Sequence, residues 1–148
     1  RIMEVSQFTD YSLRLLIFVG LKDDELCSVK EIATAYNISQ NHLVKVAHNL
    51  SKKGYLETFK GKGGGIRLAK PANEINVGKI VRLTESTSLL ECFPPKAKQG
   101  GCCIAGICKL QGILHQALSK FMQELDAFTL EDLLHNKSVM RSRLKLSK

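Results

Sequence analysis

A chain of 148 residues, 44% of them hydrophobic, suits one domain, or one small domain with a dimerisation element, and no apolar run is long enough to span a membrane. The formal charge of +8 is unevenly spread: residues 28–70 carry a net charge of +6, residues 137–148 carry +5, and the remainder carries −3. Such basic regions are typical of a protein that binds nucleic acid, although a solvated basic surface has the same pattern. The first apolar run is interrupted by Arg14 and lacks the features of a signal peptide, so we expect a soluble, cytoplasmic protein.

The first forty residues predict two helices. Residues 6–20 place apolar side chains on one face of a helix that Ser6 or Thr9 can cap. Ser28 and Glu31 have the spacing of a capping box, which begins a second, shorter helix. Asn37 is suited to end that helix in the left-handed conformation.

A third helix and a hairpin follow. Ser39 is positioned to cap a helix that ends at Gly54, and the tight turn before it predicts a helix-turn-helix. Residues 55–59 alternate like a strand, residues 61–65 are rich in glycine, and residues 66–68 form the return strand. A hairpin after a helix-turn-helix is a wing, so the chain is predicted to be mainly α with a small β-hairpin wing.

The start of the third helix and the tip of the wing are the candidate DNA-binding surfaces. Residues at the start of such a helix reach base edges in the major groove, where amide side chains pair with adenine. Small residues beside Lys and Arg suit the wing tip for contact with the DNA backbone. The alternatives are ordinary capping residues and an ordinary hairpin turn. The candidate residues are Ser39, Gln40, Asn41, His42, Lys45, Lys60, Lys62, Gly63, Gly64 and Arg67.

The second half of the chain contains a long amphipathic helix. A short helix is predicted over 75–85, and the Pro and Gly pairs make residues 89–107 irregular. Apolar residues then recur with helical spacing over 109–128, and Thr129 caps a last short helix. So wide an apolar face favours dimerisation, with packing onto the chain's own core as the alternative.

Three cysteines lie in the irregular segment or directly after it. Cys92, Cys102 and Cys108 could supply thiolates to an iron–sulfur cluster, and the nearby glycines allow the backbone to bend around it. Structural zinc and a catalytic dithiol both favour CxxC pairs, which are absent, and free cysteines without a shared role are the remaining alternative. Three thiolates are one ligand short of four, and the fourth could be a carboxylate, a histidine or a residue of the partner chain. Cys27 is isolated and is expected to be a small buried hydrophobic residue.

These motifs, in this order, resemble the Rrf2 family of bacterial winged-helix regulators. The likeness extends from Met3 to Leu134. The segments at 102–110 and 125–133 favour the family's nitric-oxide-sensing repressors over its regulators of iron–sulfur biogenesis. The segments that first carry the likeness are Phe-Thr-Asp-Tyr-Ser-Leu-Arg (8–14), Ile-Ser-Gln-Asn-His-Leu-Val-Lys (38–45) and Lys-Gly-Lys-Gly-Gly-Gly-Ile-Arg-Leu (60–68).

The resemblance implies a homodimer that binds a pseudo-palindromic operator in double-stranded DNA and carries one iron–sulfur cluster per subunit. A 4Fe–4S cluster is expected, with 2Fe–2S as the alternative. The family's ligand positions correspond to Cys92, Cys102 and Cys108, with Asp10 of the partner subunit as the fourth. The gap from Cys92 to Cys102 is longer than the resemblance leads us to expect, with an insert around 94–101. Cys103 is an extra thiol that could replace Cys102, but the five residues between Cys102 and Cys108 fit the family pattern. Reaction with nitric oxide would release the operator, so we expect a transcriptional repressor and not an enzyme.

The sequence predicts four parts of the chain and leaves three alternatives for its function. The alternatives are a family member that senses redox or iron status, a thiol-redox enzyme that uses Cys102 and Cys103, and a DNA-binding module without a cluster. The thiol enzyme is disfavoured because no activating basic residue or helix N-terminus is evident beside those thiols. The predicted parts are a winged helix-turn-helix domain (3–86), a cluster-binding loop (87–108), a dimerisation helix with a short last helix (109–136) and a basic tail that is a candidate for disorder (137–148).

Overall fold

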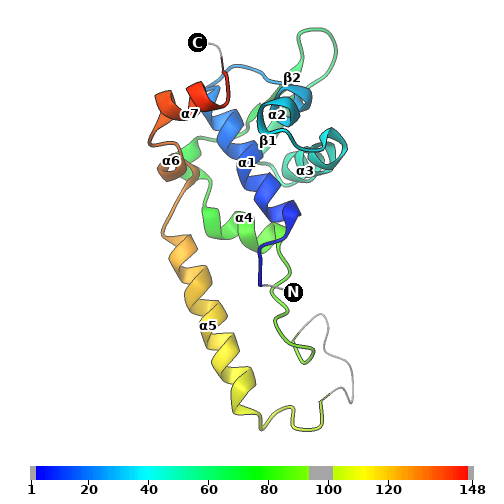
Figure 1. Ribbon diagram of the computed structural model, residues 1–148, viewed down its shortest axis with the longest axis vertical. Coiled ribbons are helices and arrows are strands. Elements are labelled where there is room, and N and C mark those ends of the chain that lie inside the picture. Colours follow the sequence, from blue (N-terminus) through cyan, green and yellow to red (C-terminus); the bar gives the residue numbers. More distant parts are fainter. Residues whose placement is uncertain (1–2, 94–101, 147–148) are drawn as a thin grey trace.

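A computed structural model describes residues 3–93 and 102–146. A compact unit carries all the short elements, and one long helix, α5, extends away from it (Figure 1). None of the described helices is long and apolar enough to cross a membrane. The elements are α1 (Gln7–Leu21), α2 (Val29–Tyr36), α3 (Gln40–Lys52), β1 (Leu56–Phe59), β2 (Gly65–Leu68), the 3-10 helix η1 (Ala72–Glu74), α4 (Val77–Thr84), α5 (Lys109–Asp126), α6 (Leu130–Leu133) and α7 (Lys137–Arg143).

The predicted helix ends are confirmed by their caps. Ser6 Oγ accepts the Thr9 amide at the start of α1, and Ser28 and Glu31 form the reciprocal capping box of α2. Asn37 ends α2 with a left-handed φ of 55°. Asn37 at the end of α2 and the Ser39 cap at the start of α3 flank the turn between these two helices, and the helix-turn-helix prediction is confirmed.

The wing is a two-stranded antiparallel hairpin that is tied to the rest of the domain at its base. Leu56 pairs with Leu68 in the register of β1 and β2. Ile66 also exchanges two backbone hydrogen bonds with Cys27, of 3.1 and 2.8 Å, in the connector between α1 and α2. A Cβ on Gly65 would lie 2.7 Å from the Cys27 carbonyl oxygen, so glycine permits this close approach. The mainly α fold with a β-hairpin wing is therefore confirmed.

The core of the compact unit is built around α1. Residues from α1, α2, α3, the wing and α6 pack into one cluster, and Cys27 belongs to it with 2% of its surface exposed. Cys27 is therefore the small buried hydrophobic residue that the sequence predicts. The largest fully buried side chains are Phe18, Leu15, Leu16, Leu21, Ile32, Leu43, Leu50, Ile75, Ile80 and Leu130.

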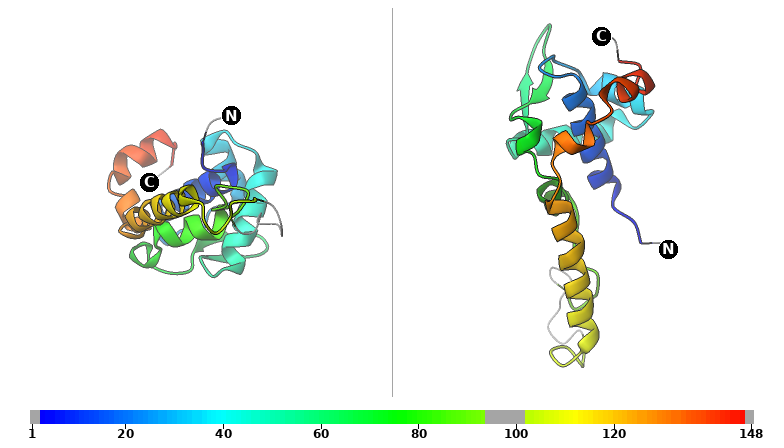
Figure 2. Two further views of the ribbon diagram at one scale, coloured as in Figure 1. Left: turned by 90° about the horizontal axis from the view of Figure 1, so that it is seen from below. Right: turned by 90° about the vertical axis from the view of Figure 1, so that its left-hand side faces the viewer.

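The C-terminal end of α5 is fixed firmly to α4. Both terminal guanidinium nitrogens of Arg82 pair with the Asp126 carboxylate, and Asn76 Nδ2 donates to the Asp126 carbonyl oxygen at 2.8 Å. Met122 packs against Val77 and Val81 in a second small cluster. The far end of α5 lies well away from the compact unit in both side views (Figures 1 and 2). The long helix is thus attached to the compact unit through its last two turns.

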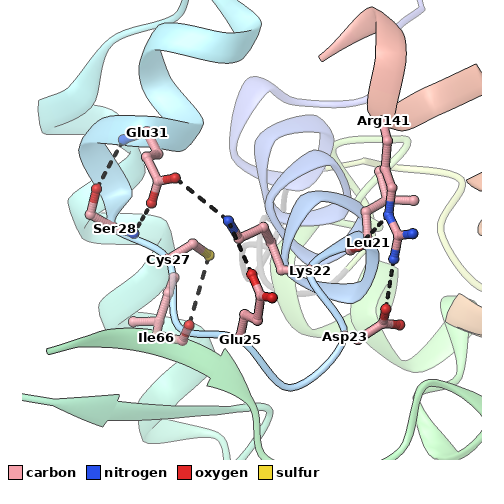
Figure 3. Close-up of polar contacts among 9 residues, drawn as sticks. All are labelled: Leu21, Lys22, Asp23, Glu25, Cys27, Ser28, Glu31, Ile66 and Arg141. Atoms are coloured by element: carbon pink, nitrogen blue, oxygen red, sulfur yellow. Dashed lines mark hydrogen bonds and ion pairs between the residues drawn. The ribbon is translucent and has the colours of Figure 1, made fainter. Parts of the chain in front are cut away.

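The basic tail, a candidate for disorder in the sequence, instead forms helix α7, and the described chain continues to Leu146. Arg141 Nε donates to the Leu21 carbonyl oxygen at 2.8 Å, and Arg141 Nη2 lies 2.6 Å from Asp23 Oδ2 (Figure 3). Met140 and Leu144 pack against the main core. Helix α7 is held in place because two apolar side chains, one helical turn apart, pack on the core and Arg141 binds the end of α1 and the connector after it.

Replacing Arg141 with alanine should destabilise the protein by about 1 kcal/mol, because the hydrogen bond to the Leu21 carbonyl is partly buried. Asp23 is 61% exposed, so its ion pair adds little. Urea unfolding would measure the change. The matched control is Arg143→Ala on the exposed side of the same helix. Equal stability of the two variants would contradict a docking role for Arg141.

Candidate nucleic-acid interface and metal site

Helix α3 has one buried face and one polar face. Leu43, Val46, Ala47 and Leu50 are buried, as the sequence predicts. Ser39 Oγ accepts the His42 amide at 3.2 Å and so caps the helix. The exposed residues of the helix are Gln40, Asn41, Val44, Lys45, His48 and Lys52. The structure therefore brings Gln40, Asn41 and Lys45 together on one accessible surface.

His42 differs from the other candidates on α3. Its side chain is half-buried, and its ring meets the Tyr11 ring edge-on at a centroid distance of 4.8 Å. Phe8 lies on the same side at 6.4 Å. His42 thus connects the start of α3 to α1 and is the least exposed of the predicted contacts on this helix.

The wing carries the second group of candidates. Lys60 and Lys62 are exposed at the tip, and Gly63 has a φ of 78°, which glycine adopts without strain. The Gly64 amide donates to the Gly61 carbonyl oxygen at 3.0 Å and closes the turn. The tip therefore presents two lysines on a compact glycine turn.

Arg67 is more constrained than the lysines at the tip. Its Nε donates to Glu57 Oε2 at 2.8 Å, and its guanidinium lies 4.9 Å from the centre of the Phe59 ring. These contacts hold the side chain along the hairpin. Because Glu57 offsets part of its charge, Arg67 is a weaker phosphate contact than Lys60 or Lys62.

The wing and α3 form one continuous body. The hydroxyls of Ser51, in the last turn of α3, and Thr58, on β1, lie 3.0 Å apart. Both elements lie on the same side of α1 (Figure 1). Val44 and His48 are not among the residues predicted from the sequence, although they lie four and eight residues after Gln40, on the same side of the helix.

The candidate ligands are spread over the described chain. Cys92 is half-buried beside Phe93, whose carbonyl accepts the Ser88 hydroxyl at 3.0 Å. The Phe93 ring lies 6.1 Å from the ring of His115, which places the turn with Cys92 against α5. Cys102 is exposed, as is its neighbour Cys103.

Cys108 is the N-cap residue of α5, and no side chain caps this end of the helix. The free amides of the first turn and the positive end of the helix dipole favour a thiolate or another anion there. A cluster held by thiolates carries such negative charge. The donor chemistry of Cys92, Cys102 and Cys108 therefore fits an iron–sulfur cluster.

The described residues do not bring the candidate ligands together into a metal site. Across residues 3–93 and 102–146, no three His, Cys, Asp or Glu residues lie close enough to hold a metal ion. Asp10 instead pairs with Arg14, one turn further along α1, at 2.9 Å. The insert expected between Cys92 and Cys102 falls mostly at 94–101, outside the described residues.

Cys27 is unsuited to ligation. Burial, reinforced by the nearby Glu31 carboxylate, raises the pKa of its thiol to about 12. Its Sγ lies 3.7 Å from the Ile66 carbonyl oxygen, inside the core (Figure 3). A thiolate at this position would be strongly disfavoured at neutral pH, so Cys27 is a structural residue.

Comparison with known proteins gives one consistent result. Residues 5–136 match the Rrf2 family model, described as an iron-dependent transcriptional regulator. The HTH-type transcriptional regulator NsrR of Halalkalibacterium halodurans is 47% identical over 97% of this chain and 99% of its own length. The protein of the same name from Bacillus subtilis is 43% identical over 97% of this chain and 99% of its own length.

Solved structures agree in fold. IscR from T. potens superposes with a TM-score of 0.71 at 24% identity, covering 89% of this chain and 86% of its own. CymR from Staphylococcus aureus superposes with a TM-score of 0.68 at 27% identity, covering 88% and 97%. The family match and the near full-length identity lead to one conclusion: the chain belongs to the Rrf2 family of transcriptional regulators.

Proposed function

We propose that this transcriptional regulator is a repressor that senses nitric oxide through a bound iron–sulfur cluster of the 4Fe–4S type. The observation that carries the proposal is the position of Cys108, which is the N-cap residue of α5, the long helix that extends away from the DNA-binding unit. Any change in what Cys108 binds acts directly on α5. The likeness to regulators named NsrR over nearly the whole chain supports the same function.

Operator binding would use α3 and the wing. Gln40, Asn41 and Lys45 are exposed at the start of α3 and can enter the major groove. Lys60 and Lys62 at the wing tip can pair with phosphates beside it. Such a regulator works where the bacterial chromosome is, in the cytoplasm.

Dimerisation would use the outer face of α5. Leu110, Ile113 and Phe121 are 51%, 53% and 51% exposed, whereas Met122 on the inner face is buried against α4. The alternative, that the helix packs onto the chain's own core, accounts only for this inner face. A second copy could cover the outer face, and the two subunits would then present two copies of α3 to a pseudo-palindromic operator.

The proposed ligands are Cys92, Cys102 and Cys108, with Asp10 of the partner subunit as the fourth. When bound, the cluster supplies iron that nitric oxide can attack. The three thiolates would hold the loop before α5 in a single arrangement, and the first-turn amides of α5 would stabilise their charge. Asp10 lies at the start of α1, so its ligation would join one subunit's loop to the DNA-binding unit of the other.

Fluorescence anisotropy would test this function. Anaerobically purified, cluster-loaded protein is titrated onto a duplex that the same protein selects from a randomised pool, before and after exposure to nitric oxide. We expect affinity to fall by about 5- to 150-fold, the usual range for coupled sites. Cys108→Ala protein serves as the control, because its affinity should be low and unaffected by the gas. Equal affinity of cluster-loaded protein in both conditions would disprove nitric-oxide sensing.

A further inference from the structure

Val44 is an apolar side chain in the middle of the polar face of α3. It is 49% exposed. Gln40 lies one helical turn before it and His48 one turn after it, and both are exposed. Asn41 and Lys45 complete its surroundings, also exposed. An aliphatic side chain is thus placed at the centre of the surface that would meet DNA.

This position is not explained by folding. Val44 belongs to neither of the two hydrophobic clusters of the described chain. Valine is also a poorer helix former than alanine, because its branched Cβ restricts the side chain within a helix. At this exposed position valine adds nothing to either hydrophobic cluster and is less favourable for the helix than alanine, so contact with a bound partner is the role that its position favours.

Most other exposed large hydrophobic residues have a different setting. Leu110, Ile113 and Phe121 lie along the outer face of α5, and Ile104 and Ile107 lie in the cysteine segment. Phe59, on the wing, is covered by the Arg67 guanidinium. Among the described residues, Val44 is the exposed large hydrophobic side chain on α3, and polar side chains suited to base edges surround it.

The major groove offers one apolar group, the C5-methyl of thymine, and aliphatic side chains recognise it by contact. The restricted χ1 of valine means that little side-chain entropy is lost when its methyl groups are fixed in the groove. We propose that Val44 determines operator specificity by packing against a thymine methyl in each half-site. This inference rests on the DNA-binding function proposed above and adds to it one base that the operator must contain.

Removal of the methyl group from the DNA tests the contact directly. Each thymine of the selected duplex is replaced in turn by deoxyuridine, which pairs identically but lacks the methyl. Anisotropy then gives the affinity of unmodified protein and of Val44→Ala for every duplex. At one symmetry-related pair of thymines, the replacement should lower the affinity of unmodified protein about fourfold per half-site. The affinity of Val44→Ala should not fall further at that pair.

Val139→Ala is the matched control, because Val139 is 52% exposed on α7, away from α3. Its response to every deoxyuridine should equal that of unmodified protein. If each deoxyuridine affects Val44→Ala and unmodified protein equally, Val44 does not read thymine, although sequence-specific binding stands. If unmodified protein enriches no sequence from the pool, the DNA-reading function itself fails and the role of Val44 fails with it.

Discussion

Cys108→Ala protein, purified without oxygen, is expected to contain no iron–sulfur cluster and to bind its operator only weakly. Cys108 is the N-cap residue of α5, and its sulfur is the proposed ligand closest to the helix that would hold the dimer together. Without this thiolate only two thiolates and the proposed carboxylate of Asp10 remain, and we expect them not to retain a cluster that is held mainly by thiolates. Loss of iron and of visible absorption is the expected first result.

The same replacement at each cysteine defines the ligand set. Cys92→Ala and Cys102→Ala should also lose iron, whereas Cys103→Ala should retain it and is the matched control, since Cys103 is an exposed neighbour of Cys102. Iron and sulfide are measured per chain. A 4Fe–4S centre requires twice the iron and sulfide of a 2Fe–2S centre, so the same assay determines the cluster type.

Two outcomes would contradict this ligand set. A full complement of iron in Cys108→Ala would exclude Cys108 as a ligand and remove the proposed link between the cluster and α5. Loss of iron in Cys103→Ala with retention in Cys102→Ala would exchange the roles of these two residues. Circular dichroism of each variant establishes that the helices persist, as expected because neither Cys102 nor Cys103 is buried.

The DNA-binding unit could be predicted from the sequence because its signals are local. The Ser28–Glu31 capping box, the left-handed Asn37 and the Ser39 cap each involve neighbouring residues, and each has the predicted contacts. The buried face of α3 follows from helical periodicity alone. A surface residue such as Val44 is harder to recognise, because its importance depends on a partner and not on the fold.

Features that depend on distant residues could not be predicted in the same way. The docking of α7 depends on a hydrogen bond between Arg141 and a carbonyl 120 residues earlier. The Arg82–Asp126 pair likewise joins side chains 44 positions apart. The candidate metal site is even harder to predict from local sequence, because the proposed ligands do not meet within the described chain. Three of them come from a loop and the fourth is proposed to come from a second subunit.

Phe121→Glu is expected to convert a dimer into a monomer without unfolding the chain. Phe121 is 51% exposed on the outer face of α5, so a charge there is tolerated in the monomer. In a dimer the same carboxylate would be buried between apolar side chains, which is strongly unfavourable. Sedimentation velocity would measure the mass, and urea unfolding would measure how much of the stability depends on association.

Loss of the dimer should weaken operator binding far more than loss of one base contact. Two linked DNA-binding units gain about 100- to 10,000-fold in affinity over one, because the second half-site is bound at a high effective concentration. Gln116→Glu adds the same charge at an exposed polar position of α5 and should leave both mass and affinity unchanged. If Phe121→Glu protein remains dimeric and binds its operator normally, the outer face of α5 is not the subunit interface. The proposed ligation of one subunit's cluster by Asp10 of the other would then fail as well, because it requires two subunits that associate along this helix.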